Sequence, residues 1–356
     1  MKQDQKIERV FFVLLQSALS GTSGNLSPYG KLSEDDWRRI NELSNKQRLK
    51  SVLFLAIEHL PEDQLPPKTT LIKWYGQTML IKRRNDDYRG KCKALLDIYK
   101  ENEIEPIILK GESCAKYYPG DDSRALGDLD LYLEDKSGSH AEGHIWAWHE
   151  GNRLAAHHGA TVEIHDYKHS HIYWKGILVE NHRLLTTVRG AKEKQEFEKH
   201  LQQIIPSADF EVLFLMAHMF QHFINGGFSL RQICDWALCA RARHKEVNWD
   251  SYHFWINNLG ISKFSNTILF IVQNYLSINL VISGGAGDVS AQLARRVLDD
   301  ALYGEQEIIT SKNSIKYRIK QLRLMSRNRW KYRIFMGENV LVAYYKMVVS
   351  YFFDKV

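Results

Sequence analysis

The chain has 356 residues, a formal net charge of +6, and 44% hydrophobic and 25% charged residues. These values exclude a disordered or fibrous chain, and the length suggests about two or three domains with a substantial core. No run of about 20 apolar residues is present that could span a bilayer. The apolar run at 10–15 is short and follows two acids, so we expect an amphipathic first helix rather than a signal peptide.

The four cysteines are Cys92, Cys114, Cys234 and Cys239. They form no Cys-x-x-Cys pair and are too few to hold a disulfide scaffold of this size. We therefore expect reduced thiols packed in helices, in a soluble protein of the cytoplasm.

Residues 1–102 are expected to form a helical scaffold. A first helix is predicted over 7–19, and a second begins at Ser33, because a serine followed by acids suits a helix start. Apolar residues recur at helical spacing from 37 to 60, and the prolines that follow end that helix. A long helix over about 69–102 then leads into the next region.

Residues 103–190 are expected to form an α/β core. Strands are predicted near 106–110, 127–133, 160–166 and 172–181, with a helix over about 139–158 between the second and third. The last two strands can pair as a hairpin across 168–170.

Asp128 and Asp130 stand two positions apart inside the apolar run 127–133. Side chains at i and i+2 of a strand point to the same face, about 7 Å apart, so both carboxylates can share divalent cations. A buried strand has no structural use for such a pair, although an exposed edge or loop end would tolerate it. The spacing predicts a metal site, with Mg²⁺ as the expected ion and Mn²⁺ as the alternative.

Just upstream, the apolar run 106–109 ends in Lys110-Gly111, and 112–118 has helical character. A glycine lets the backbone come close to a ligand, and the amides at a helix N-terminus favour phosphate. The order strand, glycine turn, helix and second strand would hold a triphosphate on one wall of the site and its metal ions on the other, as phosphoryl transfer requires. A nucleoside triphosphate is therefore the expected substrate.

These residues resemble the nucleotidyltransferase superfamily that includes DNA polymerase β, in which a glycine turn and a helix precede Asp-x-Asp on a strand. The segments Leu109–Gly111, Tyr118-Pro119, Arg124 and Gly127–Leu131 are more closely similar to an uncharacterised bacterial family of that superfamily. The helical stretch around Leu230-Arg231 is similar as well, so the resemblance covers most of residues 30–280. It implies a mainly helical α+β fold, with a small mixed-sheet core flanked by N-terminal and C-terminal helical regions.

The resemblance also implies a third acidic residue, followed two positions later by histidine. Glu180 before His182 is similar to that element, which makes Asp128, Asp130 and Glu180 the expected catalytic and metal-binding residues. Glu163, in another strand-like stretch, is the alternative third carboxylate.

Five residues are expected to bind the nucleotide: Lys110, Gly111, Ser113, Arg124 and Arg231. Superfamily members commonly have serine directly after the glycine, whereas Glu112 stands here and Ser113 comes one position later. Arg124 can alternatively pair with Asp121 or Asp122, which precede it. Arg231 can alternatively form an intrahelical ion pair with Asp235.

Histidines gather in and around the expected core, at 157, 158, 165, 169 and 171. They lack the helical His-x-x-x-His spacing with an acid, and no cysteine accompanies them. We therefore expect them to face solvent or the substrate cleft rather than to bind zinc.

Residues 191–300 are expected to form a C-terminal helical domain that opens near Ser207. His218 and His222 lie four apart on one helix face, where they can either face the nucleotide or fix helix packing. The glycine-rich stretch 283–288 lacks the spacing and lysine of a Walker loop, so it is interpreted as a hinge.

Residues 301–356 form a basic tail. From Ile308 to Gly337 there are nine lysines and arginines and no acid, with aromatic residues between them, and 340–353 is strongly apolar. A solvated or self-packed helix, a helix at an anionic membrane surface, and a nucleic-acid-binding stripe are the three interpretations, in that order.

The sequence thus predicts a Mg²⁺-dependent nucleotidyltransferase that moves a nucleoside monophosphate to a hydroxyl acceptor on a small molecule or protein. The alternative is a non-catalytic, nucleotide-binding helical adaptor that acts through its basic tail. The acceptor, the base of the nucleotide and the oligomeric state do not follow from the sequence.

Overall fold

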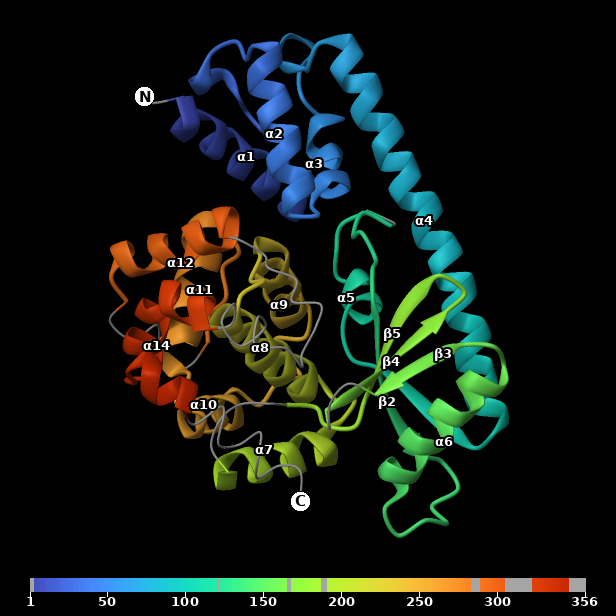
Figure 1. Ribbon diagram of the computed structural model, residues 1–356. Helices are drawn as coiled ribbons and strands as arrows, with labels where there is room; N and C mark the ends of the chain where they lie inside the picture. The colour runs from blue at the N-terminus through green and yellow to red at the C-terminus, as the bar shows by residue number, and fades with distance from the viewer. Residues whose placement is uncertain are drawn as a thin grey trace.

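The computed structural model describes residues 3–120, 122–164, 168–186, 191–282, 289–304 and 322–345. Most of these residues are helical, and one five-stranded sheet lies among the helices (Figure 1). The expected mainly helical α+β class is confirmed. The expected hinge at 283–288, His165, and much of the basic tail lie outside the described residues.

The N-terminal part is a helical layer. It consists of α1 (Gln3–Ser20), the short turn η1 (Ser27–Tyr29), α2 (Glu34–Lys46), α3 (Lys50–Ile57) and the short turn η2 (Glu62–Gln64). The side chain of Ser33 accepts a hydrogen bond from the Asp36 amide, and the Asp36 carboxylate accepts one from the Ser33 amide. This capping box explains why α2 begins where the sequence predicts.

Helix α4 (Lys68–Glu101) runs from the N-terminal helices to the sheet (Figure 1). At one end, the indole of Trp74 donates to the Lys50 carbonyl at 3.1 Å. At the other end, the indole of Trp174 donates to the Lys91 carbonyl at 2.8 Å. The helix therefore connects the scaffold to the strands that carry the predicted site.

The strands are β1 (Ile104–Ile108), β2 (Leu129–Asp135), β3 (Thr161–Ile164), β4 (His169–Trp174) and β5 (Ile177–His182). Their order across the sheet is β1-β2-β5-β4-β3, with β2 and β5 parallel and the other neighbours antiparallel. The expected single strand over 172–181 is wrong, because Lys175 and Gly176 adopt positive φ angles of 46° and 84° and turn the chain. The result is a tight β4–β5 hairpin.

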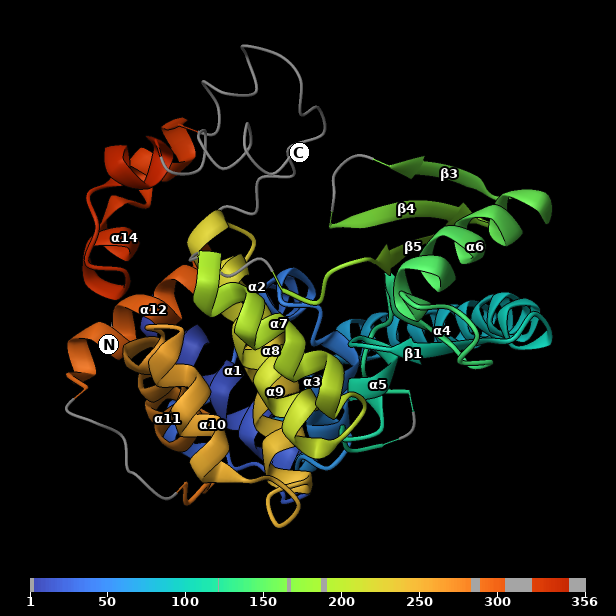
Figure 2. The same cartoon turned by 90° about the horizontal axis from the view of Figure 1, so that it is seen from below.

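Helices α4 and α6 (Gly143–His157) cover one face of the sheet (Figure 2). Leucines of β2 pack there with Val179 and Ile172. Gly151 allows α6 to come close to the sheet, since a Cβ at this position would lie 2.2 Å from the Leu133 side chain. The other face of β2, β4 and β5 carries the polar residues Asp130, Glu180 and His171.

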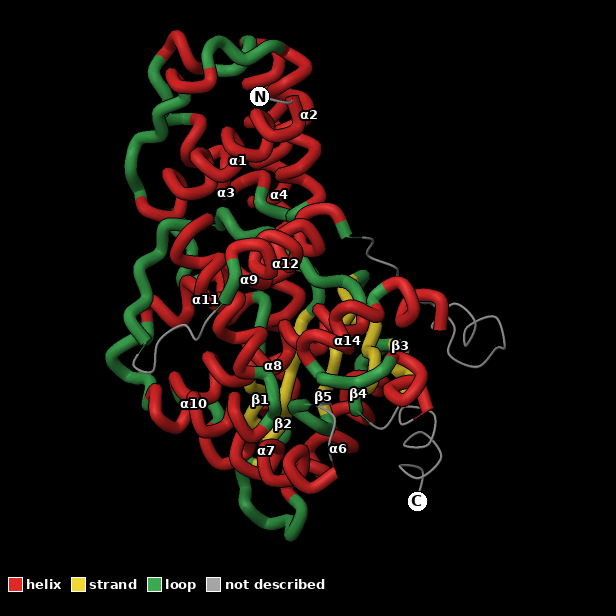
Figure 3. The backbone as a smooth tube through the Cα atoms, turned by 90° about the vertical axis from the view of Figure 1, so that its left-hand side faces the viewer, coloured by secondary structure: helices red, strands yellow, loops and turns green. Residues whose placement is uncertain are grey.

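The C-terminal helices are α7 (Ala191–Ile204), α8 (Ala208–Asn225), α9 (Leu230–Ala242), α10 (Trp249–Asn258), α11 (Ser262–Tyr275), α12 (Ala291–Tyr303) and α14 (Arg329–Phe335). They lie beside the N-terminal helices (Figure 3) and share one continuous apolar core with them. The buried Gln47 side chain joins the two parts, because it donates to the Leu302 carbonyl and accepts from the Leu230 amide. None of the helices in these described stretches has the length and apolarity needed to cross a membrane.

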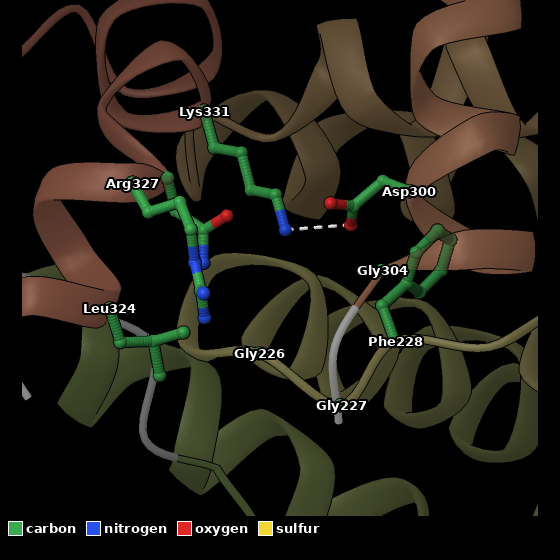
Figure 4. A pocket seen from close by; sticks show the side chains of 9 residues that line it. Gly226, Gly227, Phe228, Asp300, Gly304, Leu324, Arg327 and Lys331 are labelled. Atoms are coloured by element: carbon green, nitrogen blue, oxygen red, sulfur yellow. Dashed lines mark hydrogen bonds and ion pairs between the residues drawn. The ribbon is translucent and has the colours of Figure 1, made fainter. Parts of the chain in front are cut away.

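Part of the basic tail packs onto this core. The Lys331 ammonium is buried and donates to Asp300 at 2.6 Å and to the Phe223 carbonyl at 2.8 Å. A small pocket lies beside this ion pair, between the Gly226-Gly227 turn and α14, and Figure 4 shows Lys331 reaching toward Asp300 across it. For this stretch of the tail, the structure shows a self-packed helix.

Candidate functional site

The core of the site is a pair of carboxylates on neighbouring strands. Asp130 of β2 and Glu180 of β5 are direct register partners in the parallel pair. Adjacent strands lie about 4.8 Å apart, and residues opposite one another project from the same face. The structure therefore brings together two of the three predicted carboxylates, although 50 positions separate them in the sequence.

Lys110 and His182 join these carboxylates. The Lys110 ammonium lies 2.8 Å from Asp130 Oδ2, and His182 Nε2 donates to Asp130 Oδ1 at 3.0 Å. His182 Nε2 also lies 3.7 Å from Glu180 Oε2. The side chain of Asp130 is only 1% exposed, so both of its oxygens are held by cationic or hydrogen-bonding neighbours.

The charges of these groups support one another. Burial by itself would raise the pKa of Asp130 and Glu180. The Lys110 charge and the hydrogen bond from His182 hold the pKa of Asp130 below its ordinary range, and the nearby His182 and the Lys110 charge do the same for Glu180. Burial opposes protonation of His182 and Lys110 in turn, yet the neighbouring carboxylates raise the pKa of each. Both carboxylates are therefore ionised at neutral pH.

Asp128 lies at the more open end of the site. Its side chain is 41% exposed, and its Oδ2 lies 3.6 Å from the Lys110 ammonium. Lys110 thus bridges the two carboxylates of the Asp-x-Asp pair. The hydroxyl of Tyr88 donates to the Asp128 carbonyl at 3.2 Å, which fixes the backbone where β2 begins.

Gly111 makes the turn after β1 next to these residues. Its φ of 73° and ψ of −98° favour glycine, and a Cβ here would lie 3.4 Å from the Asp128 carbonyl oxygen. The expected helix over 112–118 is shorter than predicted, because α5 (Glu112–Ala115) is a single turn. Pro119, which follows soon after, cannot continue a helix. A dipole from a long helix is therefore absent at this turn.

The segment that enters β2 is held by α4. The Asn85 side chain donates to the carbonyls of Asp122 and Arg124 at 3.2 and 2.9 Å and accepts from the Leu126 amide at 3.0 Å. Arg89, also on α4, pairs with Glu112 at 2.7 Å and with Asp122. These contacts fix the loop from which Asp128 projects.

Glu163, the alternative third carboxylate, lies farther away. It is the register partner of His171, which in turn is opposite Glu180. Glu163 is thus three strands from Asp130, or about 14 Å at the usual strand spacing. The sheet geometry favours Glu180 over Glu163 as the companion of Asp130.

Helix α8 contributes two histidines, His218 and His222, close enough to the site to feel the charge of Lys110. Nε2 of His218 and Nε2 of His222 are 2.9 Å apart. Burial, followed by the charge of Lys110, lowers the pKa of both imidazoles, and that of His222 falls to about 4. The two imidazoles are therefore neutral at neutral pH, and they lie within electrostatic reach of the predicted site.

Two arginines predicted to bind the nucleotide are engaged elsewhere. The buried Arg124 guanidinium donates to both carboxylate oxygens of Asp235 on α9, at 2.8 and 2.7 Å, and Tyr118 donates to the same carboxylate at 2.7 Å. Arg231 donates to the Ala125 carbonyl at 3.1 Å. Of the alternative partners predicted for Arg124, Asp122 pairs with Arg89 instead, and Asp121 lies outside the described residues. Asp235, the alternative partner predicted for Arg231, accepts hydrogen bonds from Arg124.

Ser113 lies on the single turn α5, where its hydroxyl is 4.0 Å from the Cys114 sulfur. A contact between this serine and phosphate stays a prediction.

The donor atoms of the site fit a divalent cation. Asp130, Glu180 and His182 can each offer a ligand atom, and these atoms lie within 4.8 Å of one another. Carboxylate oxygens suit Mg²⁺ and Mn²⁺, and the imidazole makes Mn²⁺ a reasonable alternative. Asp128 is not part of this close group, but the Lys110 ammonium links it to Asp130.

Some neighbours of the site were not singled out from the sequence. Lys168 is close enough to lower the pKa of His182, His218 and His222 by its charge. Nothing in the local sequence marks this lysine, because it lies in a connection without a spacing pattern. Alternation along β5 does place His182 on the same face as Glu180, so this contact was accessible to sequence analysis.

Comparison with known proteins agrees with this geometry. A family model described as an uncharacterised nucleotidyltransferase matches residues 33–277, which is more than half of the chain. A search of curated proteins and a search of solved structures gave no match. The match confirms the resemblance seen in the sequence: the chain belongs to this uncharacterised nucleotidyltransferase family.

Proposed function

We propose that this protein transfers a nucleoside monophosphate from a nucleoside triphosphate to a hydroxyl acceptor, with Mg²⁺ as cofactor. The observation that carries the proposal is the pairing of the ionised Asp130 and Glu180 carboxylates across two parallel strands, beside the Gly111 turn. Membership of a nucleotidyltransferase family supports the same reaction class.

Asp128, Asp130 and Glu180 are the residues that would hold the cation. When bound, Mg²⁺ neutralises charge on the triphosphate and lowers the pKa of the attacking hydroxyl. The three carboxylates differ in access, since the side chains of Asp128 and Glu180 are 41% and 21% exposed and that of Asp130 is 1% exposed. Asp130 would therefore hold the cation from the buried side, whereas Asp128 and Glu180 are accessible to the substrate as well.

Lys110 and Gly111 would form the phosphate side of the site. The Lys110 ammonium compensates the carboxylates in the structure described here, and the same positive charge is available to a triphosphate. The backbone of Gly111 carries no side chain that would keep a phosphate away.

In the proposed reaction, the acceptor oxygen attacks the α-phosphorus while the bond to the bridging oxygen of the β-phosphate breaks, and pyrophosphate leaves. Glu180 takes the hydroxyl proton and releases it to solvent. Glu180 suits this role better than Asp130, because both oxygens of Asp130 are already engaged by Lys110 and His182.

The test uses the full chain, each of the four nucleoside triphosphates labelled at the α-phosphate, and a cell extract as the source of acceptors. We expect Mg²⁺-dependent pyrophosphate release and a labelled acceptor. Asp128→Asn should lose both signals, whereas the matched variant Asp97→Asn, at a similarly exposed aspartate on α4, should keep them. Full activity of Asp128→Asn in a folded protein would reject the assignment.

The non-catalytic adaptor is the second candidate, and one observation favours it. Arg124 and Arg231 are turned into the fold, which leaves fewer cations for a triphosphate. Calorimetry distinguishes the two candidates when combined with the labelling experiment. Heat that appears only with Mg²⁺ and nucleotide, without transfer to any acceptor, would support the adaptor.

A further inference from the structure

The two oxygens of Glu180 face different groups. Oε2 lies 3.7 Å from Nε2 of His182, on the side of Asp130. Oε1 lies 3.7 Å from Nε2 of His171, on the side of β4. We propose that His169, His171 and Glu180 Oε1 form a second metal site, which shares only Glu180 with the Mg²⁺ site, for a divalent transition ion of the Zn²⁺ or Co²⁺ type.

The distances fit such an ion. Nε2 of His169 and Nε2 of His171 are 3.1 Å apart, and the three ligand atoms lie within 4.8 Å of one another. In a tetrahedral zinc site with bonds of about 2.0–2.2 Å, ligand atoms stand about 3.3–3.6 Å apart. Small side-chain rotations would therefore bring all three atoms to bonding distance from one ion.

The strands hold these side chains in place. His169 and His171 are two apart on β4, so they share a face, and His171 is the register partner of Glu180. Ser170, between the two histidines, and Asn181, next to Glu180, point to the opposite face and are register partners of each other. There, both donate to Asn152 Oδ1 on α6, at 2.7 and 3.0 Å.

These buried hydrogen bonds support the proposed metal ligands from the opposite face of the sheet. Ser170 and Asn181 are fully buried, so their bonds to Asn152 lock β4 and β5 together at the level of the proposed ligands. Metal sites depend on such supporting contacts to keep their ligands oriented.

The donor set indicates the kind of ion. Two imidazoles and one carboxylate suit Zn²⁺ and Co²⁺, whereas Mg²⁺ prefers oxygen ligands and water. The side chains of His171 and Glu180 are 22% and 21% exposed, so a fourth position is open to water or substrate. The sequence-based expectation against zinc considered only helical spacing and cysteine, and it could not include an acid supplied by a neighbouring strand.

An ion at this site would fix Glu180. With Oε1 bound to the ion, Oε2 would stay beside His182 and Asp130. The second site goes beyond the proposed nucleotidyl transfer, although the two share Glu180, and it can exist whether or not the chain transfers nucleotides.

The test is a Co²⁺ titration of the full chain, followed by visible absorption, with Zn²⁺ added as a competitor. We expect one equivalent of Co²⁺ to give the absorption of a tetrahedral site and to be displaced by Zn²⁺ but not by excess Mg²⁺. His169→Ala and His171→Ala should each weaken Co²⁺ binding by at least about 100-fold, since loss of even an outer-shell partner costs about 10- to 100-fold.

His157→Ala is the matched control, because His157 is an exposed histidine at the end of α6. It should bind Co²⁺ as the wild type does. Circular dichroism checks that each variant is folded, and His171→Gln provides a variant that keeps more of the side-chain volume. Unchanged Co²⁺ binding in folded His169 and His171 variants would overturn the proposal, as would a wild-type chain that binds no Co²⁺.

The outcome is distinguishable from failure of the proposed function. Asp128→Asn should lose nucleotidyl transfer and keep the Co²⁺ signal. A wild-type chain that binds Co²⁺ through His169 and His171 but transfers no nucleotide would support the second site and reject the proposed activity.

Discussion

Asp130 and Glu180 lie directly opposite one another in the parallel pair of β2 and β5, and His182 Nε2 lies 3.0 Å from the first and 3.7 Å from the second. Parallel strands are joined by a crossover connection, so residues distant in sequence meet at the same level of the sheet. Here α6, β3 and β4 lie between the two strands in the chain. The site is therefore a product of topology as much as of sequence spacing.

The first prediction concerns the third carboxylate. Glu180→Gln should reduce nucleotidyl transfer by about 10²- to 10⁴-fold, because general base catalysis contributes a factor of that size. Glu163→Gln, on the same face but three strands from Asp130, should change the rate little. The measurement is kcat for both variants in the labelling assay. Equal losses in the two variants would contradict the assignment of Glu180.

A second prediction concerns Lys110. Lys110→Met removes the ammonium that lies 2.8 Å from the buried Asp130, while His182 stays as a partner. We expect unfolding free energy to fall by up to about 3 kcal/mol without divalent ions, since an unpaired buried charge is costly. Mg²⁺ should restore more stability to this variant than to the wild type. Thermal unfolding with and without Mg²⁺ checks this, and an equal response of both proteins would contradict it.

A third prediction concerns the buried ion pair of Arg124 and Asp235. Arg124→Met should lower the free energy of unfolding by about 3–5 kcal/mol, because it leaves the Asp235 carboxylate buried with Tyr118 as its remaining side-chain hydrogen-bond donor among the described residues. The double variant Arg124→Met/Asp235→Leu should recover much of this loss, because neither charge remains.

Urea unfolding of the single and double variants measures this coupling. The control is Arg38→Met, which removes an exposed ion pair on α2 and should leave the unfolding midpoint unchanged. A double variant no more stable than Arg124→Met would show that packing, rather than charge, dominates here.

A fourth prediction concerns pH. Burial lowers the pKa of His222 from 6.5 to about 4 in the folded chain, so between these values the unfolded chain binds a proton that the folded chain does not. The contribution of His222 to the free energy of unfolding should therefore be fully present above pH 6.5. It should decrease as the pH falls toward 4, with a slope of at most about 1.4 kcal/mol per pH unit. His222→Gln should flatten that slope in urea unfolding measured at several pH values. An exposed histidine variant, His157→Gln, should keep it.

Much of the fold followed from local sequence signals. The Ser33 cap, the long helix α4, and the strand with Asp130 were all predicted near their observed positions, because capping, helical periodicity and alternation act over a few residues. Asp128 was expected inside that strand, but it lies one residue before β2 begins. The break at Lys175-Gly176 was missed, because three apolar or aromatic residues flank this pair on each side and give both flanks the same strand-like character.

The parts of the site that depend on distant contacts could not be predicted in the same way. Arg124 has acidic neighbours in the sequence, yet its partner is Asp235, 111 positions away. The choice between Glu163 and Glu180 needed the strand order, and so did the proximity of His171 to Glu180. A linear pattern lists candidate ligands, but only the sheet order shows which of them share one face and one level.

Asn85 holds the segment that leads into β2 through three hydrogen bonds from α4. The protein thus holds this segment in place by its own contacts. A nucleotide that docks against it would lose its own freedom but would not have to order this stretch of protein, which removes a common penalty from the binding free energy. Replacing Asn85 should therefore weaken affinity through increased loop entropy, even though its side chain touches neither the carboxylates nor the imidazoles.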